Sequence, residues 1–337
     1  MTTTRIGLAG YGFGGRIFHA PLLAAAAGVE FAGVVTRSPQ RRAELARDHP
    51  GVEAFDDLAG LAAAGADAVA ISTPVGTHIA LVLEAIELGL AVVSDKPFAL
   101  DAAQALTAVE AAEAAGVVLS VYQNRRWDSD LLTVRRLLER GELGEVTLFE
   151  SAFERFSSEP VPASGGGILR DFGSHLIDQA LLLFGPVATV FGDVGAGEPE
   201  ARFLAVLEHR SGMTSHVSGD WVQGAPGPRF RVRGSTGAYV VFGMDGQEEA
   251  LIAGRTPAGE GDAWGSEPPE RWGRLQRGDA SQPVPSERGR WDSFYPAFAA
   301  AVRGEAPVPV DPRDAVASLT VIDAIRASSA SRRTIEL

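Results

Sequence analysis

The sequence predicts an α/β protein in which an amino-terminal parallel sheet is followed by a carboxyl-terminal α+β domain with a large, mostly antiparallel sheet. Two patterns predict this architecture. Up to about residue 122, short apolar segments alternate with helical ones, as in βαβ units. Beyond that point strand-like segments follow one another through short connections, which is typical of antiparallel sheets. We therefore expect a first domain at 1–122 and a second at 123–337, with the last helices packing back on the first domain.

The first domain should alternate strands and helices along the chain. Strands are expected at 5–10, 29–35, 66–72, 90–94 and 117–122. Helices are expected at 16–27, 41–47, 78–88 and 101–115. Asp101 can cap the last of these helices through its carboxylate, and Gly89 stands where a left-handed residue would end the third.

The second domain should be built mainly from strands. They are expected at 146–156, 189–194, 202–208, 213–222, 229–234 and 238–242. The stretch 253–286 is rich in glycine, proline and charged residues, so we expect a long loop there. Helices at 294–302 and 314–328 should close the chain.

Composition restricts the functions that this chain can have. A sequence of 337 residues without cysteine has no disulfide, no thiolate nucleophile and no cysteine-ligated metal. The net charge of −13 argues against a general nucleic-acid surface, which needs a basic face. No apolar run reaches the roughly 20 residues of a membrane span, and no secretory segment precedes the first strand, so we expect a cytoplasmic protein that binds no membrane. Histidine spacings typical of metal sites do not occur, so we expect no metal.

A glycine-rich turn follows the first expected strand. Gly10-Tyr11-Gly12-Phe13-Gly14-Gly15 fits G-x-G-x-x-G through its first, third and sixth residues. Such glycines permit a tight turn, the approach of a pyrophosphate, and close packing of helix on strand. The pattern is weak alone, but here it lies between a strand and a helix with further βα units behind it. We therefore predict a Rossmann domain that binds a dinucleotide.

The end of the second strand predicts which dinucleotide is bound. An NAD site places an acidic residue there for the ribose 2′-hydroxyl. This chain has Thr36, Arg37 and Ser38 instead, with Arg41 and Arg42 one turn into the next helix. Hydroxyl and guanidinium groups suit a 2′-phosphate, although a solvated basic helix would look similar. We expect NADP, with NAD still possible.

Lys96 is the only lysine of the chain, against 29 arginines. A solvated cation tolerates exchange for arginine, whereas a site that needs a compact ammonium does not. An apolar run leads into Ser94-Asp95-Lys96-Pro97, which resembles the carboxyl end of a buried strand, where open α/β sheets place their chemistry. The alternative is that composition left one lysine by chance. We interpret Lys96 as a site residue.

A second candidate set lies at the start of an apolar helix. On a helix, Asp171, His175 and Asp178 would share one face. A carboxylate beside an imidazole fixes its tautomer and raises its basicity, as a general base requires. A capping carboxylate with a structural histidine is the alternative. His19 and His78 could lie near the cofactor, although such residues are more often structural.

Taken in order, these pieces resemble the glucose–fructose oxidoreductase/inositol dehydrogenase (Gfo/Idh/MocA) family. The shared features are the glycine-rich turn, a Thr-Pro with a downstream His78, a Glu-Lys-Pro that reads Asp95-Lys96-Pro97 here, and the D-x-G-x-H segment Asp171-Phe172-Gly173-Ser174-His175. The stretches 121–130 and 18–21 look most like the branch that contains NADP-dependent scyllo-inositol dehydrogenases. The resemblance covers nearly the whole chain.

The resemblance implies hydride transfer between NADP(H) and a secondary alcohol or ketone of a sugar or cyclitol. His175 would be the general base, Lys96 would bond the reacting oxygen, and Asp171 would orient the site. The implied cofactor contacts are Gly10, Gly12, Phe13, Gly14, Gly15, Thr36, Arg37, Ser38, Arg41, Ser72, Thr73, Pro74, His78, Asp95 and Lys96. The implied substrate contacts are Asn124, Arg125 and Asp178, with a structural ion pair the alternative for Arg125 and for Arg126. A cis Lys96–Pro97 bond would also be consistent with the resemblance. So would a homodimer or homotetramer formed through the second sheet.

Two other functions remain open at this point. A glycosidase on the same scaffold would use NAD only transiently and regenerate it in each cycle. A non-catalytic NADP(H)-binding sensor would have no need for Lys96, Asp171 and His175 together.

Overall fold

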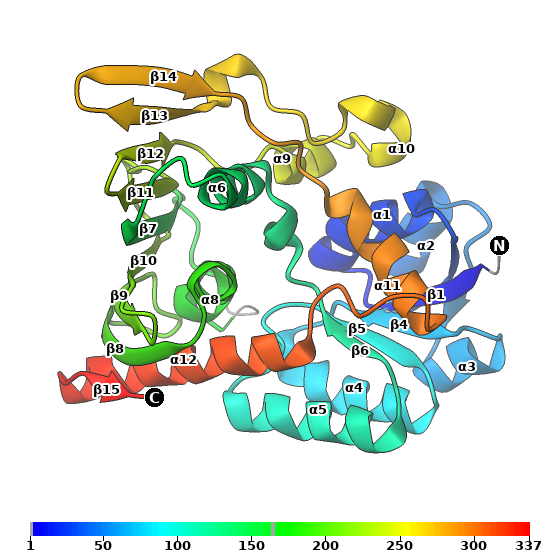
Figure 1. Ribbon diagram of the computed structural model, residues 1–337. Helices are drawn as coiled ribbons and strands as arrows, with labels where there is room; N and C mark the ends of the chain where they lie inside the picture. The colour runs from blue at the N-terminus through cyan, green and yellow to red at the C-terminus, as the bar shows by residue number, and fades with distance from the viewer. Residues whose placement is uncertain (1–2, 163–165) are drawn as a thin grey trace. The chain divides into compact units, whose positions relative to one another are not determined.

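The computed structural model describes residues 3–162 and 166–337, which fold as two compact units (Figure 1). The first unit contains the chain up to Gln123 together with Gln247–Trp264 and Arg290–Ala315. The second unit contains Asn124–Gly246, Gly265–Gly289 and Val316–Leu337. The chain therefore leaves and re-enters the first unit, so the units are not two successive blocks of sequence.

The sheet of the first unit is parallel. Its strands are β1 (Thr4–Ala9), β2 (Val29–Val35), β3 (Ala54–Phe55), β4 (Ala68–Ile71), β5 (Ala91–Ser94) and β6 (Leu119–Val121). They lie in the order β3-β2-β1-β4-β5-β6, with each neighbouring pair parallel. This is the doubly wound order in which ligands bind where the strand order reverses, beside the carboxyl ends of β1 and β4. The predicted Rossmann sheet is confirmed.

Helices cover both faces of this sheet. The helices of this unit are α1 (Ala20–Ala25), α2 (Pro39–Asp48), α3 (Leu58–Ala63), α4 (His78–Glu87), α5 (Ala102–Ala115), α9 (Gln247–Ile252), α10 (Pro257–Glu260) and α11 (Phe294–Val302). Helices α4 and α5 lie on one face, and α1 and α11 on the other (Figure 1). Asp101 caps α5 by accepting from the amide of Gln104, as predicted. The expected helix 16–27 is interrupted, because Pro21 has no amide hydrogen to continue the ladder; a π-helical turn, Gly15–His19, precedes α1 instead.

The second unit is built on a large, mostly antiparallel sheet, which confirms the predicted class. Its strands are β7 (Val146–Glu154), β8 (Val187–Val194), β9 (Arg202–His209), β10 (Thr214–Asp220), β11 (Phe230–Gly234), β12 (Gly237–Val241), β13 (Gly273–Arg277), β14 (Ala280–Val284) and β15 (Ile335–Glu336). They lie in the order β14-β13-β12-β11-β7-β10-β9-β8-β15. Strands β7 and β10 run parallel, and the other neighbouring pairs are antiparallel.

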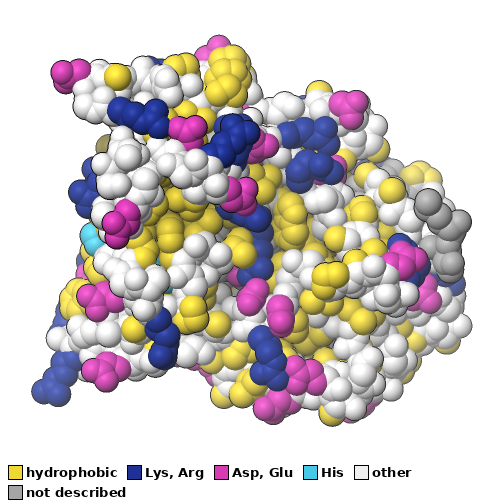
Figure 2. All heavy atoms as spheres, in the orientation of Figure 1, with side chains coloured by type: hydrophobic (Ala, Val, Ile, Leu, Met, Phe, Trp, Pro, Cys, Tyr) yellow, Lys and Arg dark blue, Asp and Glu magenta, His cyan; other side chains and the backbone are white. Residues whose placement is uncertain are grey.

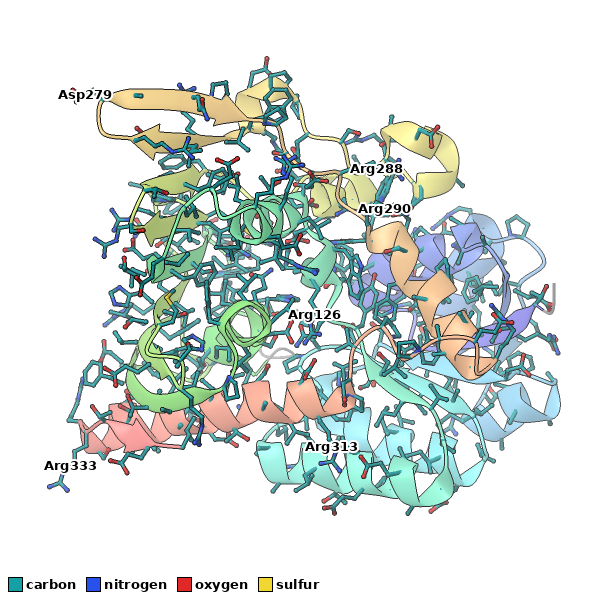
Figure 3. All side chains as sticks on the ribbon, viewed as in Figure 1. Arg126, Asp279, Arg288, Arg290, Arg313 and Arg333 are labelled. Atoms are coloured by element: carbon teal, nitrogen blue, oxygen red, sulfur yellow. The ribbon has the colours of Figure 1, made fainter. Side chains whose placement is uncertain are left out.

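The expected loop at 253–286 is wrong in part. Strands β13 and β14 form a hairpin with Asp279 at its tip (Figure 3), and they extend the sheet at its edge. Four of the five residues of β14 are exposed, and Pro283 sits in this edge strand, where a missing amide hydrogen is tolerated. Such a strand has little apolar alternation, so its composition looked like that of a loop.

Helices α6 (Ser129–Glu139), α7 (Ile168–Asp171), α8 (Gly173–Phe184) and most of α12 (Pro312–Ser331) complete the second unit. Helix α8 packs on β7 and β10. None of the helices within the described ranges is both long and apolar enough to cross a bilayer.

On the face seen in Figure 2, arginines are interspersed with acidic side chains, so neither charge dominates it.

Candidate active site

The glycine-rich turn follows β1, and the need for glycine differs along it. A Cβ on Gly10, whose φ is +97°, would lie 2.3 Å from the carbonyl oxygen of Ser72. One on Gly15 would lie 2.2 Å from the carbonyl oxygen of Gly10. At Gly12 an added Cβ would meet no protein atom within 4 Å. Packing therefore requires the first and last glycines, whereas Gly12 leaves the backbone open to a ligand, which fits a dinucleotide pyrophosphate.

Side chains from the ends of β4 and β5 meet beside this turn. The hydroxyl of Ser72 donates to Asp95 Oδ2 over 2.9 Å. A Cβ on Gly14 would lie 2.9 Å from the Ser72 hydroxyl oxygen and 3.5 Å from Asp95 Oδ2. Parallel strands bring their carboxyl ends to one sheet edge, so three predicted cofactor residues from distant parts of the sequence come together there.

Asp95 has two further partners. The amide of Lys96 donates to its Oδ1 over 2.8 Å, and His19 Nε2 lies 3.2 Å from its Oδ2. Burial alone would raise the pKa of the Asp95 carboxyl, but the nearby imidazole of His19, aided by Lys96 and His78, lowers this pKa to about 2. Asp95 is therefore an anion at any working pH.

The Lys96–Pro97 bond is cis, as expected. Behind it lies His78, which is buried at the start of α4. Its Nδ1 is 2.9 Å from the carbonyl oxygen of Pro97, and its Nε2 is 2.8 Å from that of Thr73. Both ring nitrogens thus face protein carbonyls. His78 therefore contacts the backbone of two predicted cofactor segments, at Thr73 and at Pro97.

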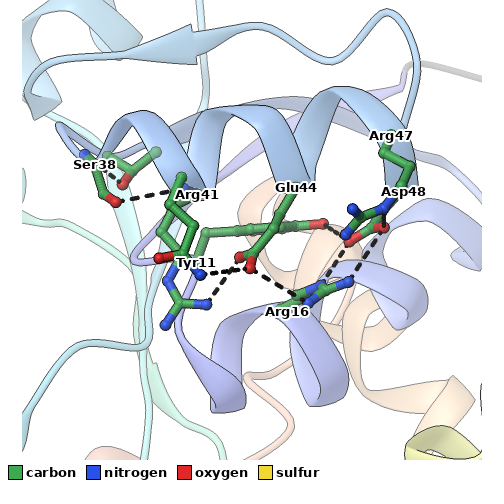
Figure 4. A network of polar contacts seen from close by, with 9 residues as sticks. Tyr11, Arg16, Ser38, Arg41, Glu44, Arg47 and Asp48 are labelled. Carbon is green, nitrogen blue, oxygen red and sulfur yellow. Dashed lines mark hydrogen bonds and ion pairs between the residues drawn. The ribbon is translucent and has the colours of Figure 1, made fainter.

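The residues expected near the adenosine ribose lie after β2 and on α2. Ser38 caps α2 by accepting from the amide of Arg41, whose guanidinium bonds Glu44 over 2.8 Å. Figure 4 shows how Glu44 also pairs with Arg16 of the glycine-rich turn's helix. The hydrogen bond from Arg41 is the main cause that lowers the pKa of Glu44.

The neighbouring arginines have other partners. Arg42 donates to the carbonyl oxygen of Thr36 and pairs with Asp56. Arg37 is exposed and donates to the carbonyl oxygen of Asp56. Of these basic residues, Arg41 is the one whose partner lies on its own helix.

In the second unit, Asp171, His175 and Asp178 follow one helical path. Helix α7 ends at Asp171 and α8 begins at Gly173, but Phe172 between them keeps helical angles, and its carbonyl oxygen accepts from the amides of His175 and Leu176. His175 is buried, and Asp171 is half-buried. The predicted spacing on one face therefore holds.

Asp178 is bound by a residue that was not among the predicted contacts. Arg126 (Figure 3) donates to both carboxylate oxygens, over 2.8 and 2.6 Å, from the turn Asn124–Trp127. Both side chains are almost completely buried. A bidentate pair of this kind has defined geometry and locks the turn onto α8.

Arg125 is also built into the fold of the second unit. Its guanidinium pairs with Asp128 over 3.1 Å and lies 4.9 Å from the centre of the Phe153 ring. Its carbonyl oxygen accepts from the side chain of Gln179, which in turn accepts from Arg229 over 2.7 Å. Asn124, in the same turn, is buried.

Several supporting residues could not be identified from the sequence. Tyr295 contacts His19 over 2.5 Å although the two are 276 positions apart. Asp128 and Asp130 follow the Asn124–Trp127 turn in the sequence. Burial raises the pKa of both carboxyls, that of Asp130 to about 6. No local pattern marks such contacts.

Across the described parts of the chain, no group of three His, Asp or Glu side chains is arranged to hold a metal ion.

Comparison with known proteins gives consistent matches. The model of an oxidoreductase family with an NAD-binding Rossmann fold matches residues 4–123, and a GFO/IDH/MocA C-terminal domain matches residues 131–240. A scyllo-inositol 2-dehydrogenase (NADP(+)) of Bacillus subtilis is 33% identical, covering 100% of this chain and 97% of its own. A D-apiose dehydrogenase of Paraburkholderia graminis is 30% identical over 84% of this chain and 76% of its own.

Solved structures agree with these matches. A putative oxidoreductase from Bacillus subtilis superposes with a TM-score of 0.92 at 33% identity, covering 100% of this chain and 99% of its own. One from Yersinia pestis gives 0.91 at 35% identity, covering 100% and 97%.

Proposed function

The chain belongs to the Gfo/Idh/MocA family of NAD(P)-binding oxidoreductases, and on this premise we propose that it is an NADP-dependent dehydrogenase or reductase of a cyclitol or sugar. Relatives named as inositol and apiose dehydrogenases act on CH–OH groups, which supports this reaction class. The observation that carries the proposal is the lone Lys96 beside the half-buried Asp95 anion at the carboxyl edge of the sheet. A scyllo-inositol-like substrate is the first candidate.

We assign the chemical roles as follows. His175 takes the hydroxyl proton while the carbon–hydrogen bond breaks and a carbonyl forms, and it returns the proton in the reverse direction. Lys96 donates a hydrogen bond to the reacting oxygen, where negative charge develops. Asp171 orients the histidine and the substrate. When bound, the nicotinamide supplies the hydride acceptor or donor. Asn124, Arg125 and Asp178 are proposed polyol contacts, with the latter two also serving the ion pairs described above.

NADP is the proposed cofactor because of the residues after β2. Thr36, Ser38 and Arg41 offer hydroxyl and guanidinium donors where NAD sites carry an acid for the ribose. Around the phosphates, the candidate contacts are the glycine-rich turn and Phe13, together with Ser72, Thr73 and Pro74.

A spectrophotometric screen tests this function. The protein is incubated with NADP⁺ or NAD⁺ and a panel of inositols, aldoses and keto-sugars, and absorbance at 340 nm is followed. We expect net NADPH formation with a cyclitol or sugar alcohol, and a higher kcat/KM with NADP⁺ than with NAD⁺. A glycosidase would cleave glycosides without net NADPH. Absence of turnover with every substrate would contradict the proposal.

We also propose that copies of the chain associate through the second sheet. Phe191 on β8 and Leu204 on β9 are 41% and 45% exposed, although both lie in regular strands. Apolar side chains on a sheet face favour association. Light scattering should give a dimer or tetramer, and Leu204→Arg should reduce the mass; a monomeric wild type would contradict this.

A further inference from the structure

Two buried histidines contact the residues on either side of Lys96. His19 contacts the side chain of Asp95, and His78 contacts the carbonyl of Pro97. Both imidazoles are almost fully enclosed, with exposures of 0% and 1%. We infer that His19 and His78 are positioning residues, which hold the backbone of Lys96 from both sides so that its ammonium meets the reacting oxygen. The inference rests on the proposed function, because it explains how Lys96 is placed.

His19 has one well-defined orientation. Its ring packs on Tyr122 with centroids 4.3 Å apart, and its Nδ1 lies 2.5 Å from the Tyr295 hydroxyl. Nε2 then lies 3.2 Å from Asp95 Oδ2, within ion-pair distance but outside hydrogen-bond geometry, and an ionised carboxylate only accepts, so this contact needs the proton on Nε2. Because the other carboxylate oxygen accepts from the Lys96 amide, Asp95 links the imidazole to the lysine backbone.

His78 joins two strand ends. Its nitrogens contact the carbonyl oxygens of Thr73, after β4, and Pro97, after β5. A carbonyl oxygen only accepts, so a hydrogen bond at either contact needs the proton on the ring nitrogen that faces it. Loss of the Pro97 contact would release the carboxyl side of the lysine, while loss of the Thr73 contact would affect the neighbouring turn.

These contacts can be tested by replacing each histidine with asparagine and with glutamine. The asparagine amide lies near the position of the histidine Nδ1, and the glutamine amide lies near that of Nε2. His19→Gln keeps a donor to Asp95, whereas His19→Asn loses it. His78→Asn keeps a donor to Pro97, whereas His78→Gln loses it. Glutamine is therefore the better replacement at position 19, and asparagine is the better one at position 78. A general loss of packing would not produce this reversal. His49→Gln is the control, because His49 packs against Phe31 in the same unit, away from this segment.

We expect the rate of hydride transfer in single turnovers to fall about 30-fold or more in His19→Asn and His78→Gln, since small displacements of a catalytic group are costly. His19→Gln and His78→Asn should stay within about fivefold of the wild type, on the same reasoning. The Kd of NADPH should change less than the rate of hydride transfer does in His19→Asn and His78→Gln. Equal rates within each pair, or the reverse order, would overturn the inference.

A second readout does not depend on turnover. Reductive methylation with ¹³C-formaldehyde labels Lys96 as the chain's only lysine, apart from the amino terminus. The dimethyl-lysine NMR signal should move toward the free-lysine position in His19→Asn and His78→Gln and stay in place in the matched variants and in His49→Gln. An unchanged signal throughout would overturn the inference. This pattern in a protein without turnover would retain the positioning and reject the proposed function.

Discussion

Lys96 owes its proposed role to properties that arginine lacks. A compact ammonium with rotatable donors can bond a small reacting oxygen, whereas a guanidinium is planar, larger and always charged. The chain otherwise uses arginine for its basic residues, so an ordinary cation at position 96 would tolerate the exchange.

Lys96→Arg should therefore retain NADPH binding while kcat falls by roughly 100-fold or more, because the donor is misplaced at the reacting oxygen. The Kd by NADPH fluorescence and kcat at saturating substrate measure the two effects separately. A kcat near that of the wild type would reject the special role of the lysine.

Arg41 and Glu44 should set cofactor preference in opposite directions. Arg41→Ala removes a cation proposed for the 2′-phosphate, so kcat/KM for NADP⁺ should fall about tenfold while that for NAD⁺ changes little. Glu44→Gln removes the carboxylate that pairs with Arg41 and should raise NADP⁺ affinity by about two- to fivefold. The exposed Arg47 serves as control through Arg47→Ala. Parallel losses with both cofactors would assign Arg41 to stability instead.

Asp95 gives a pH dependence of stability with a defined sign. Its pKa is lowered from 3.8 to about 2 in the folded protein, so the anion stabilises the fold above pH 4, and this contribution is lost as the pH falls through about 2. The shift corresponds to about 2 kcal/mol at roughly 1.4 kcal/mol per pH unit. Urea unfolding should show the stability difference between wild type and Asp95→Asn shrinking by that amount between pH 4 and 2. A difference independent of pH would contradict the assignment.

The glycine-rich turn predicts two unlike outcomes within one element. Gly15→Ala places a Cβ 2.2 Å from the carbonyl oxygen of Gly10, so the turn must shift and Tm should fall by several degrees. Gly12→Ala meets no protein atom within 4 Å, so Tm should stay near that of the wild type while NADPH affinity falls about tenfold or more. Thermal unfolding and NADPH titration distinguish them. Unchanged binding by Gly12→Ala would place the pyrophosphate elsewhere.

Elements with strong local patterns could be predicted from the sequence. Buried strands such as β4 and β5 are largely continuous apolar runs. Asp101 predicts the start of α5, because its carboxylate can cap a helix. The hairpin β13–β14 could not be predicted, because a solvated edge strand lacks apolar alternation. The interruption before α1 is a local effect of Pro21, which lacks the amide hydrogen that a continuous helix needs.

The position of Ser72 and Asp95 beside the glycine-rich turn could be predicted, because motif and strand end coincide there. Their partners could not. The contact of His19 with Tyr295 depends on the return of Arg290–Ala315 to the first unit, and the pairing of Arg126 with Asp178 depends on packing of a turn against α8. Tertiary structure alone brings such residues together.

At the scale of the whole molecule, each unit supplies part of the proposed chemistry. The first unit carries the dinucleotide turn and Lys96, and the second carries Asp171 and His175. Family membership is established over both, since separate models match residues 4–123 and 131–240.

Transfer of deuterium tests the central claim most directly. The protein is incubated with NADP⁺ and scyllo-inositol, or the best polyol of the screen, deuterated at its ring carbons, and the cofactor and carbonyl product are analysed by mass spectrometry. We predict one deuterium in NADPH for each carbonyl formed, and loss of this transfer in His175→Asn. Carbonyl formation without deuterium in the cofactor, or no product with any polyol, would contradict the account.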